Sequence, residues 1–504
     1  MRGALRHDTR VLQPWGGLRK IRLEPGNLAD QGSLVHQHDR FRATGFRRDF
    51  AQPWYTYSPG SKGMNEAASF IMLPVLLLVI LAGFPVAFSL ISVAFAFGLY
   101  TLGDGVIVQL LSKIEDTATN SVLAAVPLFI FMGVMLERSG IADRLFEAVH
   151  LWTRRLPGGL AVGAIGLGTI FAAASGVVGA TETVIGMLAI PVMMRHNYDK
   201  RLLSGTICAG GSLGTVIPPS ITVIVLGPVA SVSVGDLFAG LLAPGLIMAL
   251  LFVAYVMTIA TLNPSLAPRE PPAPDEPNLL EKLKITAIAL IPPILLIFTV
   301  LGTILMGLAT PTEAAACGAL GTIILAAIYR RISIGVLWTA MSHSAGITAM
   351  ILLIVLGGSM FAGVFFAAGG MMAIQSMLSS SGLEGWQALC IILGLAFVLG
   401  FMMDLISVIL IIIPIAMPIV LLFGYDPVWF CIAFLVVLQT SYLTPPMAPS
   451  IFYLRAIAPP EIRLGDMYVG VLPFIAVQLL TLALILAFPQ IALWFPGVLS
   501  GPKW

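Results

Sequence analysis

Long apolar segments, separated by short polar connections, make up most of the chain. Each is long enough to cross the roughly 30 Å hydrocarbon core of a bilayer as a helix. They lie at 67–101, 121–137, 202–229, 237–262, 285–329, 334–364, 428–452 and 468–489. The pattern predicts an all-α polytopic membrane protein.

Two further apolar segments, 160–194 and 387–422, are interrupted in the middle by polar or flexible residues. The first interruption spans 174–182 and the second spans 403–407. Irregular backbone at membrane depth is tolerated only where protein or a water-filled cavity satisfies its amide groups. We therefore predict that each segment is a re-entrant hairpin of two half-helices that meet at a tip. A kinked pair of ordinary spans is the alternative.

The prolines and turn residues that interrupt the first half of the chain recur in the second half at an offset of about 227 residues. The matched positions are Pro85 and Pro311, Pro191 and Pro418, Tyr198-Asp199 and Tyr425-Asp426, and Pro218-Pro219 and Pro445-Pro446. Such internal similarity indicates a duplicated architecture. We predict a first repeat at 64–262, a Pro-rich linker at 263–282, a second repeat at 283–496 and a C-terminal tail at 497–504.

Basic residues indicate how the two repeats are oriented, because cytoplasmic connections collect Lys and Arg. Four arginines lie just before the first hairpin, whereas the counterpart at 365–386 has no basic residue; conversely, 230–236 has none where the second half is basic. The repeats are therefore predicted to be inverted, which needs an odd number of crossings in each. Five crossings result if 67–101 and 285–329 each cross twice. The first hairpin then enters from the cytoplasm and the second from the opposite side.

The composition excludes an ordinary water-soluble protein. The chain is 58% hydrophobic and 10% charged, with a mean hydropathy of +0.96, whereas a soluble domain carries about 25% charged residues. The formal net charge of +2 is unevenly distributed, because residues 1–63 hold eleven Lys or Arg against five Asp or Glu. This basic extension has no apolar run that could serve as the core of a signal peptide.

The spans that follow the hairpins are broken in both halves. Residues 209–220 and 444–450 combine flexible or hydroxyl residues with proline pairs, so a helix cannot persist and carbonyl groups are freed. Simple proline kinks are the alternative. In transporters built from inverted repeats, such breaks bind substrate and ions near the midplane, with helix N-termini suited to anions and free carbonyls suited to cations. The pattern therefore favours a secondary transporter.

Two acids at membrane depth are functional candidates, because burying a charge in a bilayer is costly. Asp404 lies at the second tip, where a Na⁺ ligand or an ion-gated hydrogen-bond acceptor is favoured over a structural cap. Glu182 follows the first tip and is either a proton-coupled or substrate-facing group or a cap of the helix that follows.

The tips and breaks together define a candidate site for Na⁺ or substrate in each half. Hydroxyl oxygens suit a hard monovalent cation, although each hydroxyl alone is typical of an interhelical hydrogen bond. The first-half candidates are Ser175, Gly176, Gly179, Ala180, Thr181, Glu182, Gly210, Gly211, Ser212, Gly214, Thr215, Pro218 and Pro219. The second-half candidates are Asp404, Ser407, Thr440, Ser441, Thr444, Pro445 and Pro446. We predict no catalytic residues, no cofactor besides Na⁺ as coupling ion, and no nucleic-acid partner. The sequence also contains no Walker nucleotide-binding motif.

Six motifs in a fixed order give the chain a family resemblance. They are PLFIFMG at 127–133, SGIA at 139–142, LPGGL at 156–160, LGTVIPPS at 213–220, ATPTEAAA at 309–316 and LTPP at 443–446. Together they resemble the large permease subunit (DctM-like) of tripartite ATP-independent periplasmic (TRAP) transporters over nearly the whole of 64–496. One departure lies at the first tip, where many members have Ser-Gly-Ser-Ser and this chain has Ser-Gly-Val-Val.

This resemblance implies a bacterial inner-membrane, Na⁺-coupled importer of the elevator type. It also implies a soluble periplasmic binding protein that delivers the substrate and a separate small four-helix subunit that braces the permease in the membrane lipid. We expect a small organic acid as substrate, since helix N-termini at the tips favour a carboxylate. Two alternatives stay open, a self-sufficient carboxylate or ion transporter of similar build and an intramembrane enzyme.

The basic extension at 1–63 has two interpretations. It is either an arm held against anionic lipid at the cytoplasmic face, or translation starts at Met64, directly before the first apolar segment. We favour the second interpretation and expect intact-mass spectrometry of the natural protein to place its N-terminus at Met64. A mass that includes Arg2 contradicts this expectation.

Overall fold

The computed structural model describes residues 62–176, 178–269, 277–445 and 447–500. All regular structure in these ranges is helical, and none of it is β-strand. The prediction of an all-α protein is confirmed. Expectations for residues up to 61, for the middle of the linker at 270–276, for Pro446 and for 501–504 lie outside the described residues.

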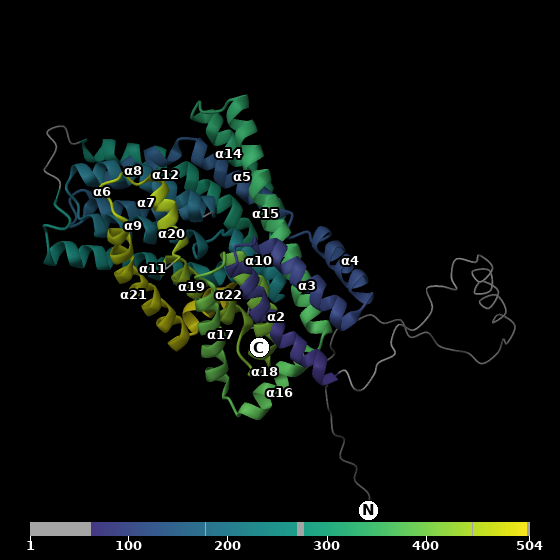
Figure 1. Cartoon of the computed structure of the whole chain (residues 1–504). Coiled ribbons are helices and arrows are strands. Elements are labelled where there is room, and N and C mark those ends of the chain that lie inside the picture. The colour runs from purple at the N-terminus through teal and green to yellow at the C-terminus, as the bar shows by residue number, and fades with distance from the viewer. Residues whose placement is uncertain (1–61, 177, 270–276, 446, 501–504) are drawn as a thin grey trace, which may run out of the picture. The chain divides into compact units, whose positions relative to one another are not determined.

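The helices follow one another through short connections, and Figure 1 shows them coloured along the chain. Those of the first half are α2 (Lys62–Leu81), α3 (Val86–Leu102), α4 (Gly105–Ala118), α5 (Ala125–Arg138), α6 (Ile141–Thr153), α7 (Gly159–Ser175), α8 (Val178–Arg195), α9 (Lys200–Ser212), the 3-10 helix η2 (Leu213–Thr215), α10 (Ile221–Ala230) and α11 (Val234–Leu262). Those of the second half are α12 (Leu279–Ile297), the π-helix η3 (Phe298–Gly302), α13 (Thr303–Leu305), α14 (Pro311–Ile328), α15 (Ile334–Ala367), α16 (Gly370–Ser381), α17 (Gly385–Leu399), α18 (Leu405–Leu422), α19 (Pro427–Leu443), α20 (Pro449–Ile457), α21 (Leu464–Ala487) and α22 (Gln490–Ser500).

The two halves match helix by helix when the offset of about 227 residues is applied. The shift pairs α3 with α14, and every helix from α6 to α11 with its counterpart from α16 to α21. One difference stands out, because the single helix α15 occupies the place of α4 and α5, which a turn separates. The helices therefore repeat in the order that the matched prolines and turn residues predict.

Both predicted hairpins are helix–turn–helix units. α7 ends at Gly176, whose φ of +63° is a conformation that glycine adopts readily, and α8 follows. In the second half, residues 400–404 separate α17 from α18. The spans that follow are broken as predicted, since η2 interrupts the path from α9 to α10 and residues 444–448 separate α19 from α20.

Three helices, α4, α6 and α16, lie where the hydrophobic pattern predicts no span. α6 illustrates the reason, because exposed Asp143, Arg144 and Glu147 alternate with buried Leu145 and Phe146. One face of such a helix is apolar, but its average hydropathy is low. A search for long apolar runs therefore misses it.

Two boundaries of the predicted organisation differ in the structure. α12 begins at Leu279, inside the predicted linker at 263–282, because Asn278 and Glu281 form a capping box at its start. α22 reaches Ser500, so the predicted tail at 497–504 begins as helix. The Pro-rich composition marks the linker but not the point at which the next helix is capped.

Among the described residues, six helices are long and apolar enough to cross a membrane, and α5 with α6, bent by 66°, would make a seventh. The other predicted crossings consist of shorter helices. α15 has 34 residues, about 51 Å at 1.5 Å per residue, so it must tilt or project beyond a core of roughly 30 Å. A multi-pass membrane protein is confirmed, while five crossings per repeat and the inversion stay predictions.

A polar contact between equivalent residues lies where the two repeats meet. Ser212 of α9 and Gln439 of α19 are 227 residues apart, which is the repeat offset, and Gln439 Nε2 donates to Ser212 Oγ at 3.1 Å. Two equivalent positions can touch only near the axis that relates them. Gln478 of α21 donates to the same hydroxyl at 3.3 Å, and all three residues are fully buried. The predicted twofold axis between the repeats would therefore pass beside the end of α9.

Glycine residues let α9 and α21 approach closely. A Cβ on Gly205 would collide with the carbonyl oxygen of Gly470, and a Cβ on Gly470 would collide with that of Arg201. Small residues at a helix crossing allow two backbones to meet inside a membrane. This crossing holds the first broken span against a long helix of the other half.

We expect Gly470→Val to destabilise the protein, because the α9–α21 crossing has no space for the added side chain. Overpacking of this kind typically costs about 1–3 kcal/mol. Gly465→Val is the matched control on α21, since a Cβ there meets no atom within 4 Å. Thermal unfolding in detergent measures the difference, and equal Tm values for the two variants contradict the packing role.

Candidate functional site

Each hairpin tip lies against the broken span of its own half. In the first half, the amide of Ile221 donates to the carbonyl oxygen of Gly176 at 3.4 Å, and a Cβ on Gly176 would lie 2.6 Å from the carbonyl oxygen of Pro219. In the second half, a Cβ on Gly400 would collide with Ser441 Oγ. Glycine is needed at both tips because atoms of the break occupy the space of a side chain.

The hairpins also contact the opposite half. α8 packs against α20 and α18 packs against α10, so each hairpin lies on the helix that follows the other half's break. Gly179 of α8 lies against Tyr453 of α20, where a Cβ would stand 2.7 Å from the ring. All four of these helices begin at a tip or a break, so the positive ends of their dipoles lie at these junctions.

Most of the predicted hydroxyl groups keep oxygen lone pairs available for a cation. Five of them donate their proton to a carbonyl in the preceding turn: Ser212, Thr215, Thr440, Ser441 and Thr444. A hydroxyl that donates its proton still has two lone pairs, although those of Ser212 are used by the two glutamines. Ser175 and Thr181 face each other across the first hairpin, with 3.0 Å between their hydroxyl oxygens.

Glu182 is wholly buried in α8 and links the two halves. Its Oε1 accepts from Ser450 Oγ of α20 at 2.5 Å, whereas its Oε2 has no hydrogen-bond partner among the described residues. Gly211 of α9 leaves the space for it, since a Cβ there would collide with the Cγ of Glu182. The partner of this acid is therefore a hydroxyl of the other repeat, and not the amides at the start of α8.

Asp404 is the N-cap of α18. Its Oδ2 accepts from the amide of Ser407 at 3.1 Å, and its Oδ1 accepts from the Ser407 hydroxyl. The carboxylate is exposed. The structural cap is thus present, but each carboxylate oxygen retains a lone pair for an ion.

Some predicted residues do not face the tips. Gly210 packs against α7, where a Cβ on Gly168 would lie 2.7 Å from the Gly210 carbonyl oxygen. Ser212 belongs to the glutamine cluster at the repeat axis. Pro218 and Pro219 form the first break itself and are buried. The groups that can bind an ion are thus fewer than the predicted set.

Three buried polar residues at this centre are not singled out by the sequence pattern: Gln439, Gln478 and Ser450. Ser212 donates its proton to Ala209, so both glutamines must turn their amide nitrogen toward it, and each leaves Oε1 without a partner among the described residues. A lone glutamine in a continuous apolar run is the signal that identifies such a position, because an amide is costly to bury unless it is hydrogen-bonded.

Oxygen atoms without partners show whether the region suits Na⁺. Glu182 Oε2 and Ser220 Oγ are buried at the first hairpin and break, and neither has a hydrogen-bond partner among the described residues. Both are hard oxygen donors of the kind that bind hard cations. Among the described residues, no three or more His, Cys, Asp and Glu side chains form a group that could hold a metal ion by themselves. The residues fit a monovalent cation held by few side chains.

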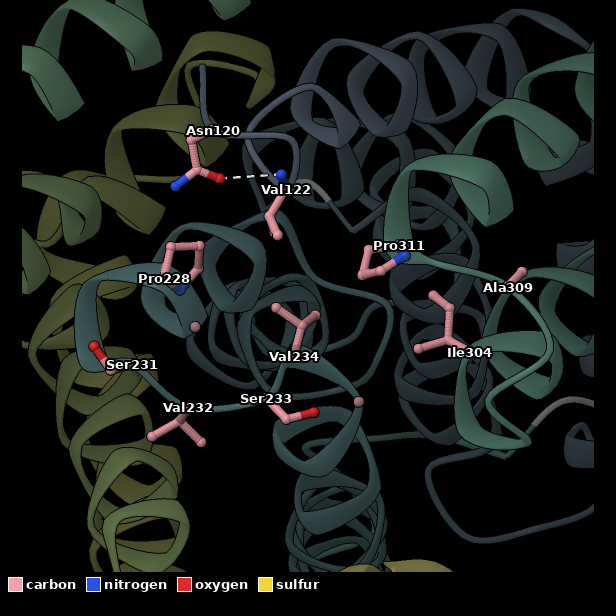
Figure 2. Close-up of a pocket in the computed structure, with 12 residues that line it drawn as sticks. Asn120, Val122, Pro228, Ser231, Val232, Ser233, Val234, Ile304, Ala309 and Pro311 are labelled. Carbon is pink, nitrogen blue, oxygen red and sulfur yellow. Dashed lines mark hydrogen bonds between the residues drawn. The ribbon is translucent and has the colours of Figure 1, made fainter. Parts of the chain in front are cut away.

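A cavity of about 480 Å³ lies at the end of α10 that is remote from the break (Figure 2). The α4–α5, α10–α11 and α13–α14 connections form its walls, and on one of them Asn120 Oδ1 accepts from the amide of Val122 at 3.0 Å. A second cavity of about 250 Å³ shares Asn120 and Pro228 with the first and reaches Lys113 of α4. None of the predicted site residues lines either cavity.

Comparison with known families decides the identity of this architecture. A sequence model described as "Tripartite ATP-independent periplasmic transporter, DctM component" matches residues 73–491, a range that includes both hairpins and both breaks. The chain belongs to the DctM family. The predicted resemblance is confirmed, and this DctM-family chain is a transporter component, not an enzyme. Membership implies a small membrane subunit and a periplasmic binding protein as partners.

Relatives and a solved structure agree with this assignment. The "C4-dicarboxylate TRAP transporter large permease protein DctM" of Pseudomonas aeruginosa is 30% identical over 389 residues, which are 77% of this chain and 89% of the relative. The "Isethionate TRAP transporter permease protein DctMQ" of Oleidesulfovibrio alaskensis is 31% identical, over 83% of this chain and 66% of the relative. The crystal structure of the Alcanivorax borkumensis YdaH transporter, described as having an unusual topology, matches with a TM-score of 0.58 at 16% identity, over 85% of this chain and 99% of that chain. This last likeness shows a shared fold.

We expect Gly211→Ala to destabilise the DctM-family chain, because its methyl group would collide with Glu182. The cost should be about 1–3 kcal/mol, as for other overpacked sites. Gly394→Ala on α17 is the matched control, since a Cβ there meets no atom within 4 Å and alanine favours a helix. Melting curves that are lowered equally, or by neither substitution, would show that Glu182 does not occupy this space.

Proposed function

We propose that the chain is the large permease subunit of a Na⁺-coupled importer of a small organic acid in the bacterial inner membrane. The observation that carries the proposal is the meeting of both hairpin tips with both broken spans in a chain of the DctM family. A centre of this kind supports binding of an ion and a substrate by backbone groups and a few side chains.

The charges of the centre explain why an ion would be needed. The hairpins at 160–194 and 387–422 and the broken spans at 202–229 and 428–452 contain two acids, Glu182 and Asp404, and no Lys, Arg or His. An organic anion would be repelled by these carboxylates at close range. Bound Na⁺ removes that repulsion, and the starts of the four helices supply backbone amides for the anion. Ion and substrate would thus bind cooperatively.

The names of the relatives support an organic acid as the substrate class. The P. aeruginosa protein is named for C4-dicarboxylates and the O. alaskensis protein for isethionate, and both compounds are small organic acids. The name DctMQ joins two components, and this chain covers 66% of that relative. A separate small subunit for the present chain agrees with this relation, and the binding protein supplies the substrate from the periplasm.

We assign an elevator movement to the hairpins and broken spans as one body. The long helix α15 packs along α3, α4 and α5 and contacts α18 of the second hairpin (Figure 1). The 480 Å³ cavity separates the end of α10 from the α4–α5 and α13–α14 connections. Space at one end of a mobile body is what a sliding movement against a fixed helix needs.

Proteoliposomes that contain the permease, the small subunit and the binding protein test the function. We expect an inward Na⁺ gradient to drive uptake of radiolabelled succinate or isethionate, since the gradient supplies the free energy of concentration. An equal K⁺ gradient is the control. Uptake that is the same in K⁺, or no uptake of either acid in Na⁺, rejects the proposal.

Asp404→Asn should raise the Na⁺ concentration for half-maximal uptake about tenfold or more, because each tenfold change corresponds to about 1.4 kcal/mol of lost interaction. Asparagine is also a good N-cap, so α18 is expected to stay capped. Asp426→Asn is the matched control, because Asp426 caps α19 through the amides of Val428 and Trp429 at the opposite end from the break. Unchanged Na⁺ dependence in Asp404→Asn removes this carboxylate from the ion site.

A further inference from the structure

Glu182 and Ser450 form an acid–hydroxyl pair between the two repeats. Both residues are 0% exposed, and Ser450 Oγ lies 2.5 Å from Glu182 Oε1. The same hydroxyl lies 3.5 Å from the carbonyl oxygen of Cys208 in α9. Oxygen atoms from α8, α9 and α20 therefore come together in the interior, and Glu182 Oε2 has no hydrogen-bond partner among the described residues.

No positive side chain of the described residues balances this acid. Lys113 pairs with Asp116, and Arg201 lies 3.8 Å from Asp466. Arg455, five residues beyond Ser450 on α20, donates to the carbonyl oxygen of Ile462 at 3.0 Å. A buried carboxylate without a counter-charge is strongly unfavourable. One hydrogen bond from a serine does not neutralise it.

The repeat shows that packing does not require the pair. At the repeat offset, the equivalents of Glu182 and Ser450 are Ile409 of α18 and Val223 of α10, both 0% exposed. The α10–α18 contact is the counterpart of the α8–α20 contact. The second interface thus carries two apolar side chains where the first carries an acid and a hydroxyl, and apolar residues in such a place are often at least as stable.

The residue that packs against Glu182 also differs between the two halves. Leu438 of α19 stands where α9 has Gly211, and only the glycine leaves room for the acid. The second half therefore has an apolar side chain at this position, whereas the first half has a glycine and a space that the carboxylate side chain fills. Both differences between the halves, the acid–hydroxyl pair and the glycine beside it, lie at one point in the structure.

We propose that Glu182, Ser450 and the carbonyl group of Cys208 bind a Na⁺ ion at a site separate from the hairpin tip. The inference rests on the proposed function in one respect, that Na⁺ is the coupling ion. The donors are hard oxygens, which suit this cation, and the carboxylate makes the bound ion electroneutral with its site. Four residues of α8, 178–181, precede Glu182, so the acid lies about 6 Å along the helix axis from the start of α8 beside the tip.

The site also connects the two repeats mechanically. α8 belongs to the first hairpin, whereas α20 follows the break of the second half, so an ion shared by them holds one half on the other. Tyr453, three residues beyond Ser450, is 45% exposed and lies against Gly179.

Equilibrium binding of radioactive Na⁺ to the purified full chain in lipid nanodiscs tests the proposal. Glu182→Gln keeps the shape of the side chain but removes its charge, and should lower the number of Na⁺ ions per chain by one. Ser450→Ala should weaken binding at this site about tenfold or more, as loss of a supporting ligand does. Glu147→Gln, on the exposed face of α6, is the matched control and should bind as the wild type does.

A double variant, Glu182→Ile with Ser450→Val, copies the apolar pair of the other half. It should fold with an unchanged or higher Tm in K⁺ and still lack the same Na⁺ ion, which separates loss of the site from loss of the fold. An equal number of Na⁺ ions in the wild type and both Glu182 variants overturns this site, even if Asp404→Asn reduces Na⁺ binding. A change of bound protons alone overturns it too. A wild type that binds no Na⁺ overturns both this site and the proposed coupling.

Discussion

Backbone groups that leave a helix inside a membrane must find partners within the protein, because lipid offers none. The structure meets this requirement by placing each hairpin tip on the break of its own half, as in the contact from the Ile221 amide to the Gly176 carbonyl. It then covers each hairpin with the helix that follows the other break. Four interruptions that would each be costly alone become one shared interior, and the groups left over there are those available to an ion and a substrate.

The two repeats achieve this arrangement with the same elements, because each contributes one hairpin and one broken span. The hydrogen bond between Ser212 and Gln439, two equivalent residues, places the repeat axis at the end of α9. What a fold of this kind needs for packing should be present on both sides of the axis, and glycine at both tips meets that expectation. A feature present on one side only, such as the Glu182–Ser450 pair opposite Ile409 and Val223, calls for an explanation other than packing.

Because the hairpins and broken spans contain few charged residues, each carboxylate there depends on the groups directly around it. With two acids and no basic side chain in the hairpins and broken spans, every nearby carboxylate must be balanced by a bound ion, a hydrogen bond or a helix start. Asp404 uses the start of α18, whereas Glu182 has a single serine. The two carboxylates therefore differ in how their charge is balanced, because Asp404 is exposed at the tip whereas Glu182 is fully buried between helices.

The sequence by itself determined the class of the protein, the order of its long apolar helices and the positions of the two hairpin tips and the two broken spans, because these depend on local chemistry. Proline lacks an amide proton, glycine tolerates a positive φ, and a run of apolar residues is stable as a helix in lipid. The same local averaging missed the amphipathic helices α4, α6 and α16, whose apolar residues lie on one face. Only the tertiary structure decided which groups meet. Glu182 and Ser450 are 268 residues apart, and a contact at that separation leaves no trace in the pattern of either segment.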